Sequence, residues 1–466
     1  MKKFLALIPT LLLCTLLCAQ DQSAVNPYQD LLVQKSLNFS FLSLIKGITG
    51  MAAIIFVCWC LSSDRKHIDW GTVAKALGLQ FVIAVSVLAF PVVQTVFEVL
   101  GNAFISVLGF TKAGSDFLFG SFMDSSKFGY VFVLQILPTI IFFSALMTLF
   151  FYLGIMQKIV WGMGWILIKV IKLSGAEALT CAGNVFVGMS EAPLMVKEYI
   201  PKMTKSELAV IMTSGMATMS GGVLAAYIGM LGGGDPAMEL EFAKHLLSAS
   251  VMAAPGAIAL SKVIVPQTEK IDNSLDVSKE KIGKNVLDAI SNGTAVGLKM
   301  AANIAALLLV FYALIAGANA ILSWISFPAV DNIIADLSGG RYTDLSLEAI
   351  LAFVFYPVIW LIGVPAEDIG LVGRLLGEKI ILTEFVGYQS MADMLRTGAF
   401  ASTKSAIMAT YVLCGFANFA SIGIVIGAVG GMAPNKREIL SEYGLKTMLV
   451  AALVALMSAA MVGIFI

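Results

Sequence analysis

Long apolar runs recur along this chain and constrain its fold more than any other feature. A helix needs roughly 20 consecutive apolar residues to cross a bilayer. Such runs lie near residues 41–61, 77–100, 130–154, 206–231, 247–265, 295–323, 402–430 and 445–466. They are continuous rather than alternating, which predicts helices and not the strands of a barrel. Only 13% of the residues are charged, against about 25% in soluble domains. We therefore expect a multi-pass protein embedded in a lipid bilayer.

Charge and composition exclude several classes of function. The 30 basic residues balance the 30 acidic ones. No basic stretch is interleaved with aromatic residues, so nucleic-acid binding is not expected. The six cysteines follow no metal-binding spacing, and the chain has only two histidines, His67 and His245. We therefore expect neither a zinc site nor catalysis by histidine.

The first 20 residues carry two lysines and then an apolar stretch, which is the layout of a signal peptide. Cleavage after Ala19 would need a small residue two positions earlier, where Leu17 stands, so retention as an extra span is the alternative. In both cases residues 21–40 lie outside the cytoplasm, in the periplasm if the protein sits in a bacterial inner membrane. Arg65 and Lys66 follow the first run on the cytoplasmic side, as the positive-inside rule expects.

Two stretches do not resemble simple crossings. Residues 156–174 place tryptophans and lysines around an apolar face, which predicts a helix lying in the membrane interface. Residues 175–200 are too interrupted by Gly, Asn, Glu and Pro to span, yet too apolar for an exposed loop. Irregular backbone is tolerated at membrane depth where protein covers it, so we expect a re-entrant hairpin here.

The second half repeats this order. A span at 295–323 precedes an interfacial helix at 346–363 and a broken segment at 366–390, and the next helix is interrupted at CGFAN, residues 414–418. In the first half, the helix at 206–231 is interrupted by TSGMATMSGG. The loop charges give the two units opposite orientations. Paired, broken and inverted segments indicate a secondary transporter with its site near the middle of the membrane.

Each hairpin carries one glutamate, Glu191 in the first and Glu384 in the second. Burying a lone carboxylate at this depth costs at least roughly 2.5 kcal/mol. Either residue alone could be a helix cap or the partner of a lysine, but two in matching positions of a repeated unit favour a binding site. Near Glu191, the side chains of Asn184, Ser190 and Thr218 could bind a small cation through oxygen, although serine and threonine also pack helices together.

At these residues the chain resembles the concentrative nucleoside transporter family. The motifs are GNVFVGMSEAPL at 183–194, K-x-x-x-x-EFV-x-Y at 379–388 and CGFANFASI at 414–422, and the resemblance runs from about residue 40 to the end. It implies a homotrimer in which each subunit has a scaffold and a moving transport domain. It also implies nucleoside uptake driven by an inward sodium gradient, and no enzymatic activity.

The resemblance assigns a set of residues to the nucleoside. They are Gly188, Met189, Ser190, Glu191, Val223, Met300, Glu384, Phe416, Asn418 and Ser421. Glu191 and Val223 are assigned to the base. Glu384, Asn418 and Ser421 are assigned to the ribose hydroxyls. This assignment is chemically sound, because a carboxylate accepts both hydroxyl protons of a diol and apolar side chains cover the ring faces.

Sodium is the coupling ion that the resemblance implies, and no cofactor is expected besides it. The implied ligands are the side chains of Asn184, Ser190 and Thr218 and the backbone carbonyls of Val187 and Met219. Proton coupling is the alternative within the same class, but a proton needs no cage of ligands. A membrane enzyme that uses paired carboxylates as acid and base, and a sensor that binds without transporting, are the alternatives from other classes.

Several positions depart from the family's common pattern. Thr383 and Gly387 stand where relatives commonly have Asn and Ala, which affects the hydrogen bonding around the second-hairpin glutamate. Met189 stands where many relatives have Gln and cannot offer an amide to a base, so selectivity should differ. Gly188 and Met189 together with Thr218 resemble purine-preferring animal members. The expected substrates are therefore adenosine, inosine or guanosine.

These interpretations give a fold and a division of the chain. We expect an all-α polytopic membrane protein with inverted repeats, two re-entrant hairpins and two broken helices, arranged as a scaffold and a transport domain. The expected parts are a signal peptide or extra span at 1–20, a periplasmic segment at 21–40, scaffold helices at 41–155, a first inverted repeat at 156–265 with its hairpin at 175–200, a cytoplasmic linker at 266–293, and a second inverted repeat at 294–466 with its hairpin at 366–390.

Overall fold

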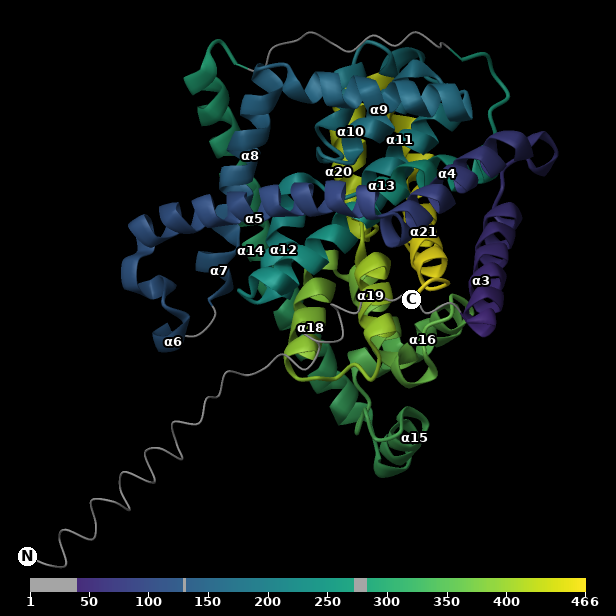
Figure 1. The fold of residues 1–466 in the computed structure, drawn as a ribbon. Helices are drawn as coiled ribbons and strands as arrows, with labels where there is room; N and C mark the ends of the chain where they lie inside the picture. Colours follow the sequence, from purple (N-terminus) through teal and green to yellow (C-terminus); the bar gives the residue numbers. More distant parts are fainter. Residues whose placement is uncertain (1–39, 129–130, 272–282) are drawn as a thin grey trace, which may run out of the picture.

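The computed structural model describes residues 40–128, 131–271 and 283–466. The expected signal peptide lies outside the described residues, as does the periplasmic segment apart from Ser40. All regular secondary structure in the described part is helical (Figure 1). Eight helices there are long and apolar enough to cross a membrane, which agrees with the predicted fold class.

The helices before the first hairpin differ from the prediction most clearly near residue 90. They are α3 (Phe41–Cys60), η1 (Arg65–His67), α4 (Trp70–Ala89), α5 (Pro91–Phe119), η2 (Gly120–Met123), α6 (Ser125–Phe128), α7 (Phe132–Gln135) and α8 (Leu137–Tyr152). The prediction of a single helix at 77–100 is wrong, because these residues are divided between α4 and α5 at Pro91. Proline cannot continue a helical hydrogen-bond ladder, and it holds Phe90 in an extended conformation. The new helix, α5, runs across α4 and α13 (Figure 1).

The first repeat has a helix at the position of the expected interfacial segment, followed by the hairpin and the broken helix. Its elements are α9 (Ile155–Ile171), α10 (Gly175–Asn184), η3 (Ala192–Val196), η4 (Ile200–Lys202), α11 (Lys205–Ala217), α12 (Gly221–Gly232) and α13 (Pro236–Ile264). Ser174 and Glu177 form a capping box that starts the hairpin helix. Thr218 ends α11 in an extended conformation, so the helix breaks where the sequence predicts.

The second repeat follows the same order. Its elements are α14 (Val286–Ile325), α15 (Pro328–Ser338), α16 (Leu347–Leu361), η5 (Ala366–Asp368), α17 (Ile369–Ile381), α18 (Glu384–Arg396), α19 (Thr403–Leu413), α20 (Phe419–Met432), η6 (Pro434–Lys436) and α21 (Arg437–Val462). Helix α14 already begins at Val286, within the stretch expected to be linker. The hairpin is two helices, α17 and α18, and the break at 414–418 separates α19 from α20.

Burial divides the helices into two groups. In the most apolar stretch of α13, 94% of the residues are buried, whereas in α14 none are. Helices α10 to α13, α17 to α19 and α21 form the packed interior, while α3, α4, α5 and α14 expose large apolar side chains. Exposed apolar surface on this scale suits contact with lipid or with other subunits. The two groups correspond to the expected transport domain and scaffold.

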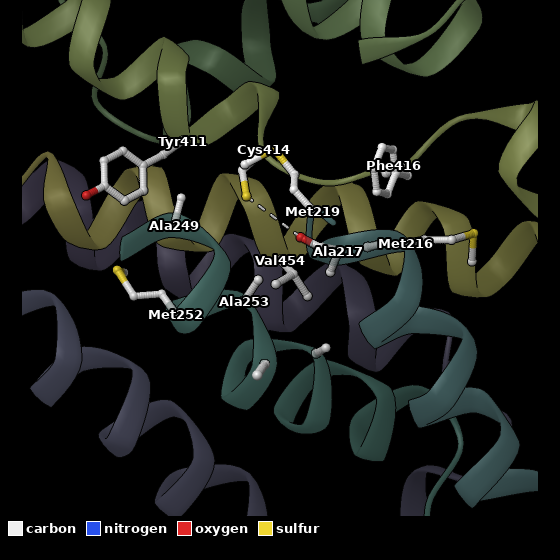
Figure 2. Packing of buried hydrophobic residues seen from close by; sticks show 14 of the residues in the cluster. Met216, Ala217, Met219, Ala249, Met252, Ala253, Tyr411, Cys414, Phe416 and Val454 are labelled. Atoms are coloured by element: carbon white, nitrogen blue, oxygen red, sulfur yellow. Dashed lines mark hydrogen bonds between the residues drawn. The ribbon is translucent and has the colours of Figure 1, made fainter. Parts of the chain in front are cut away.

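The two helix breaks pack directly against each other. Gly415 has a φ of +87°, and a Cβ there would lie 2.4 Å from the carbonyl oxygen of Ala217, the last residue of α11. The Cys414 thiol donates a weak hydrogen bond to the same oxygen, with Sγ 3.9 Å away. Figure 2 shows Cys414 and Ala217 facing each other, with Phe416 to one side. The unpaired backbone groups of both repeats therefore meet at one place.

This contact predicts the effect of replacing the glycine. Gly415→Ala would force a Cβ into the Ala217 carbonyl in a left-handed backbone conformation, which costs about 1–3 kcal/mol before the clash is counted. We expect a clearly lower melting temperature for the detergent-purified protein. Gly431→Ala is the matched control, because a Cβ at that helical glycine meets nothing within 4 Å. Equal melting temperatures for the two variants would contradict the packing of the breaks.

Candidate functional site

Glu384 is a buried carboxylate held by residues from both repeats. It is the first residue of α18, where free N–H groups and the helix dipole favour a negative charge. Its side chain is 4% exposed. The Asn418 amide donates a hydrogen bond to Oε2 at 2.7 Å, and the Tyr227 hydroxyl donates one to Oε1 at 3.2 Å. Each carboxylate oxygen therefore has one side-chain donor.

Asn418 is fixed by its position at the start of α20. Its Oδ1 accepts hydrogen bonds from the backbone N–H of Ser421 at 2.9 Å and from the Ser421 hydroxyl at 3.1 Å. This is the usual arrangement of an asparagine N-cap. The amide oxygen is thus occupied, and of its two N–H groups one bonds Glu384. Phe416 lies in the same helix break and is buried.

Lys379 joins the second hairpin to the break in α19 and α20. The buried ammonium donates to the carbonyl oxygens of Val412 at 2.9 Å and Cys414 at 2.5 Å. A cation at the C-terminal end of a helix is stabilised by the helix dipole, and α19 ends at these residues. The lysine thereby fixes the hairpin segment that carries Glu384. Lys379 is the first residue of the 379–388 motif, so the sequence singled it out. The sequence did not indicate which carbonyl groups it binds.

The first hairpin places polar atoms against α11. The Asn184 amide nitrogen donates to the Ser214 hydroxyl at 2.8 Å. Within the described residues, the buried oxygens Asn184 Oδ1 and Thr213 Oγ1 have no hydrogen-bond partner. The Thr218 hydroxyl donates to the Ser214 carbonyl at 2.8 Å, which leaves its lone pairs open. Amide and hydroxyl oxygens of this kind are hard ligands that a small cation accepts.

The turn of the first hairpin lies on the N-terminus of α12. The Gly221 N–H donates to the Phe186 carbonyl at 2.9 Å, and a Cβ on Gly188 would lie 3.6 Å from that of Ser220. Met189 is buried against Gly215 of α11.

Ser190 and Glu191, at the end of this turn, are exposed. The backbone N–H of Gly188 donates a hydrogen bond to the Glu191 carboxylate, but among the described residues no side chain does. Glu191 therefore differs from Glu384, whose carboxylate accepts hydrogen bonds from two side chains.

Helix α12 connects the two hairpins. Ser220, Val223 and Tyr227 share one face of it, because helical residues three, four and seven apart lie above one another. The first hairpin meets this face at Ser220, and Glu384 meets it at Tyr227. Seven residues of α-helix correspond to about 10 Å along the axis. The two predicted carboxylates thus flank one helix face rather than touching each other.

Met300 is half-buried on α14, a helix that packs mainly on α8. It lies against the same buried cluster to which Met189, Val223 and Phe416 belong.

Two other acidic residues of the hairpins are structural. Glu177 forms a buried ion pair with Lys262, which also donates to the Ser206 hydroxyl at 3.1 Å. Glu378 accepts a hydrogen bond from Arg374 at 2.7 Å. Breaking such pairs leaves an uncompensated buried charge. These glutamates have the lysine or arginine partners that Glu191 lacks among the described residues.

Tyr227 is the site residue that sequence reasoning missed. It belongs to none of the motifs, and it lies seven residues after the break between α11 and α12, in an otherwise apolar helix. Only the fold brings it to a residue 157 positions later in the chain.

Comparison with known families places most of the chain in one class. Residues 245–463 match a family model described as the Na+ dependent nucleoside transporter C-terminus, and residues 49–122 match its N-terminus. Residues 133–234 match a domain described as Gate, for nucleoside recognition.

Individual relatives cover almost the whole chain. An uncharacterized transporter of Haemophilus influenzae is 37% identical over 91% of this chain and 98% of its own length. Sodium/nucleoside cotransporter 1 of Mus musculus is 37% identical over 90% of this chain, which spans only 63% of that longer relative.

Solved structures show the same fold. The structure of CNTnw in an inward-facing substrate-bound state has a TM-score of 0.81 and 36% identity, and covers 91% of this chain and 99% of that one. A variant of CNTnw in an outward-facing state has a TM-score of 0.81 and 36% identity, with coverage of 91% and 98%. With these matches across its length, the chain belongs to the family of Na+ dependent, concentrative nucleoside transporters.

Proposed function

We propose that this protein imports nucleosides by sodium symport, with Glu384 and Asn418 binding the ribose. The observation that carries the proposal is the buried Glu384 carboxylate, which has one side-chain donor on each oxygen. An ionised carboxylate offers about four lone-pair sites. The side-chain donors take only two of these sites, so the vicinal hydroxyls of a ribose could donate to the same carboxylate.

The groups around Glu384 complement those hydroxyls. One N–H of Asn418 remains for a hydroxyl oxygen, since its other N–H bonds Glu384 and its Oδ1 is filled by Ser421. A diol that donates twice and accepts once would satisfy all of these groups. Phe416, in the same break, would cover a face of the ligand, and Val223 and Met300 are assigned by the resemblance to further apolar contacts.

The base would be bound by the first hairpin. Gly188, Met189, Ser190 and Glu191 form its turn, and the open Glu191 carboxylate can accept from a ring or exocyclic N–H. Met189 offers no amide to a base. Together with the resemblance to purine-preferring members, this supports adenosine, inosine or guanosine as the favoured substrates.

Sodium would occupy the polar pocket between the first hairpin and the break in α11. The unpaired Asn184 oxygen and the open lone pairs of Thr218 support this assignment. The carbonyls of Val187 and Met219 would complete the set, with the Ser190 hydroxyl closing over it. A cation here would compensate the charge of a loaded site that contains two carboxylates, and it would couple sodium binding to nucleoside binding. Proton coupling is the alternative, and it would need no sodium for uptake.

Transport would proceed by alternating access in a trimer. CNTnw has one structure in an inward-facing substrate-bound state, and a variant of it has one in an outward-facing state. We propose that the buried helices of this chain move between such states against the exposed scaffold helices. Exposed apolar side chains on α5, among them Phe110, Phe117 and Leu118, would face lipid or neighbouring subunits of a homotrimer. A bacterial inner membrane is the proposed location.

The ribose assignment predicts a large effect of one substitution. Glu384→Gln should lower the uptake of labelled adenosine at least about tenfold, because hydrogen bonds to a charged group contribute about 1.5–3 kcal/mol each. Uptake is measured in proteoliposomes with an inward sodium gradient. Glu198→Gln, at an exposed glutamate of the first hairpin, should transport like the wild type. Wild-type uptake by Glu384→Gln would refute the ribose assignment.

The sodium assignment predicts a shifted ion dependence. Asn184→Ala removes the unpaired oxygen and should raise the sodium concentration for half-maximal uptake about tenfold, a loss of about 1.4 kcal/mol in cation binding. Asn102→Ala, at an exposed asparagine of α5, is the control and should keep the wild-type value. Full wild-type uptake without sodium, driven by a pH gradient alone, would establish proton coupling instead.

The purine assignment predicts a pattern of competition. Unlabelled inosine should inhibit the uptake of labelled uridine by the wild type more strongly than cytidine does. Met189→Gln adds an amide that can bond a base edge, and it should shift this preference toward cytidine by a factor of about 10. Stronger inhibition by cytidine than by inosine in the wild type would remove the purine preference. An unchanged pattern in the variant would remove the role of Met189.

A further inference from the structure

We propose that Tyr227 is a positioning residue that orients the Glu384 carboxylate and thereby makes the transporter select ribose over 2′-deoxyribose. This inference rests on the proposed function and deepens it. The contact behind it is the hydrogen bond from the Tyr227 hydroxyl to Glu384 Oε1 at 3.2 Å.

The tyrosine ring is itself held in place. Its side chain is fully buried, and it stacks on Tyr388 with centroids 4.0 Å apart and planes at 27°. Phe385 packs edge-on against it, with centroids 4.8 Å apart and planes at 62°. Tyr388 is anchored in turn, because its hydroxyl donates to the Thr410 carbonyl at 3.2 Å. The Tyr227 hydroxyl therefore has a fixed position relative to α18 and α19.

A fixed donor matters because the carboxylate can rotate. The last torsion of a glutamate side chain is broad and has no sharp staggered minima. With Asn418 as its only side-chain donor, the carboxylate could turn about the bond to its own side chain. A second side-chain donor on the other oxygen sets the plane of the group. The remaining lone-pair sites then point in defined directions.

The start of α18 supplies only part of this orientation. The backbone N–H of Glu384 bonds its own carboxylate, but Thr383, the N-cap of α18, makes no side-chain hydrogen bond to the helix that follows it. Tyr227 comes from the other repeat, so the orientation of Glu384 depends on the docking of the two repeats. This contact also explains how a chain with Thr383 before its glutamate can still hold that glutamate in place.

Orientation would become selectivity through unfilled hydrogen bonds. A ribonucleoside donates both vicinal hydroxyls to the two directed sites, whereas a 2′-deoxynucleoside leaves one buried site unfilled. An unfilled buried polar site is costly, and sites built to bond a hydroxyl reject analogues that lack it. If the carboxylate can turn, it adapts to a single hydroxyl, and the penalty for the missing one falls.

The test compares adenosine with 2′-deoxyadenosine as substrates of purified, reconstituted protein. Tyr227→Phe keeps the ring and removes the donor. We expect the KM for adenosine to rise about tenfold, equivalent to about 1.4 kcal/mol. The KM for 2′-deoxyadenosine should change less than threefold, and the maximal rates should stay within a factor of two. Tyr411→Phe, which removes a buried hydroxyl of α19 beside His245, should retain the wild-type ratio.

A second variant without the hydroxyl keeps the inference testable if Tyr227→Phe does not fold. Tyr227→Met fills the same space with an apolar side chain of different shape. It should lower the ratio of the KM for 2′-deoxyadenosine to the KM for adenosine in the same way. A purely structural role would instead change both KM values by the same factor, or lower only the maximal rate, and either result would overturn the inference. If the wild type takes up neither nucleoside, the proposed function fails and the inference falls with it. If the wild type transports but both variants keep its ratio, only the inference fails.

Discussion

The hydrogen bonds from Tyr227 and Asn418 to the Glu384 carboxylate are the interaction on which the rest of the site depends. A charge in an apolar interior persists only where donors replace water. Here the donors come from α12 and α20, and the carboxylate comes from α18, so one group ties both repeats together. The same three helices begin at chain breaks or hairpin turns. The site therefore lies where the fold leaves backbone and side-chain polar groups open.

The breaks themselves are stabilised by close contact and by a buried cation. Gly415 lets the second break approach the Ala217 carbonyl at the end of the first. Lys379 donates to the carbonyls that α19 leaves unpaired. Both features satisfy or cover backbone groups that lipid could not hydrate. Irregular backbone can thus persist at depth, and a ligand site can be built from it.

Much of this architecture could be predicted from the sequence, because lipid imposes simple rules on helix length and polarity. The hairpin segments and both helix breaks follow from interrupted apolar runs. The boundary at Pro91 was missed because a proline at the first position of a helix does not interrupt the apolar run itself.

The partners within the site could not be predicted in the same way. Tyr227 and Lys379 act through contacts made across the chain, and an apolar helix with one tyrosine does not indicate what its hydroxyl reaches. The exposure of Glu191, against the burial of Glu384, also depends on packing rather than on pattern.

A structure of the purified protein with adenosine and sodium bound tests the central claim most directly. The account predicts that both ribose hydroxyls lie within hydrogen-bond distance of Glu384, while the carboxylate keeps its bonds from Tyr227 and Asn418. The base would lie toward Glu191. Adenosine bound away from Glu384, or a carboxylate whose remaining sites are closed by protein donors, would contradict it.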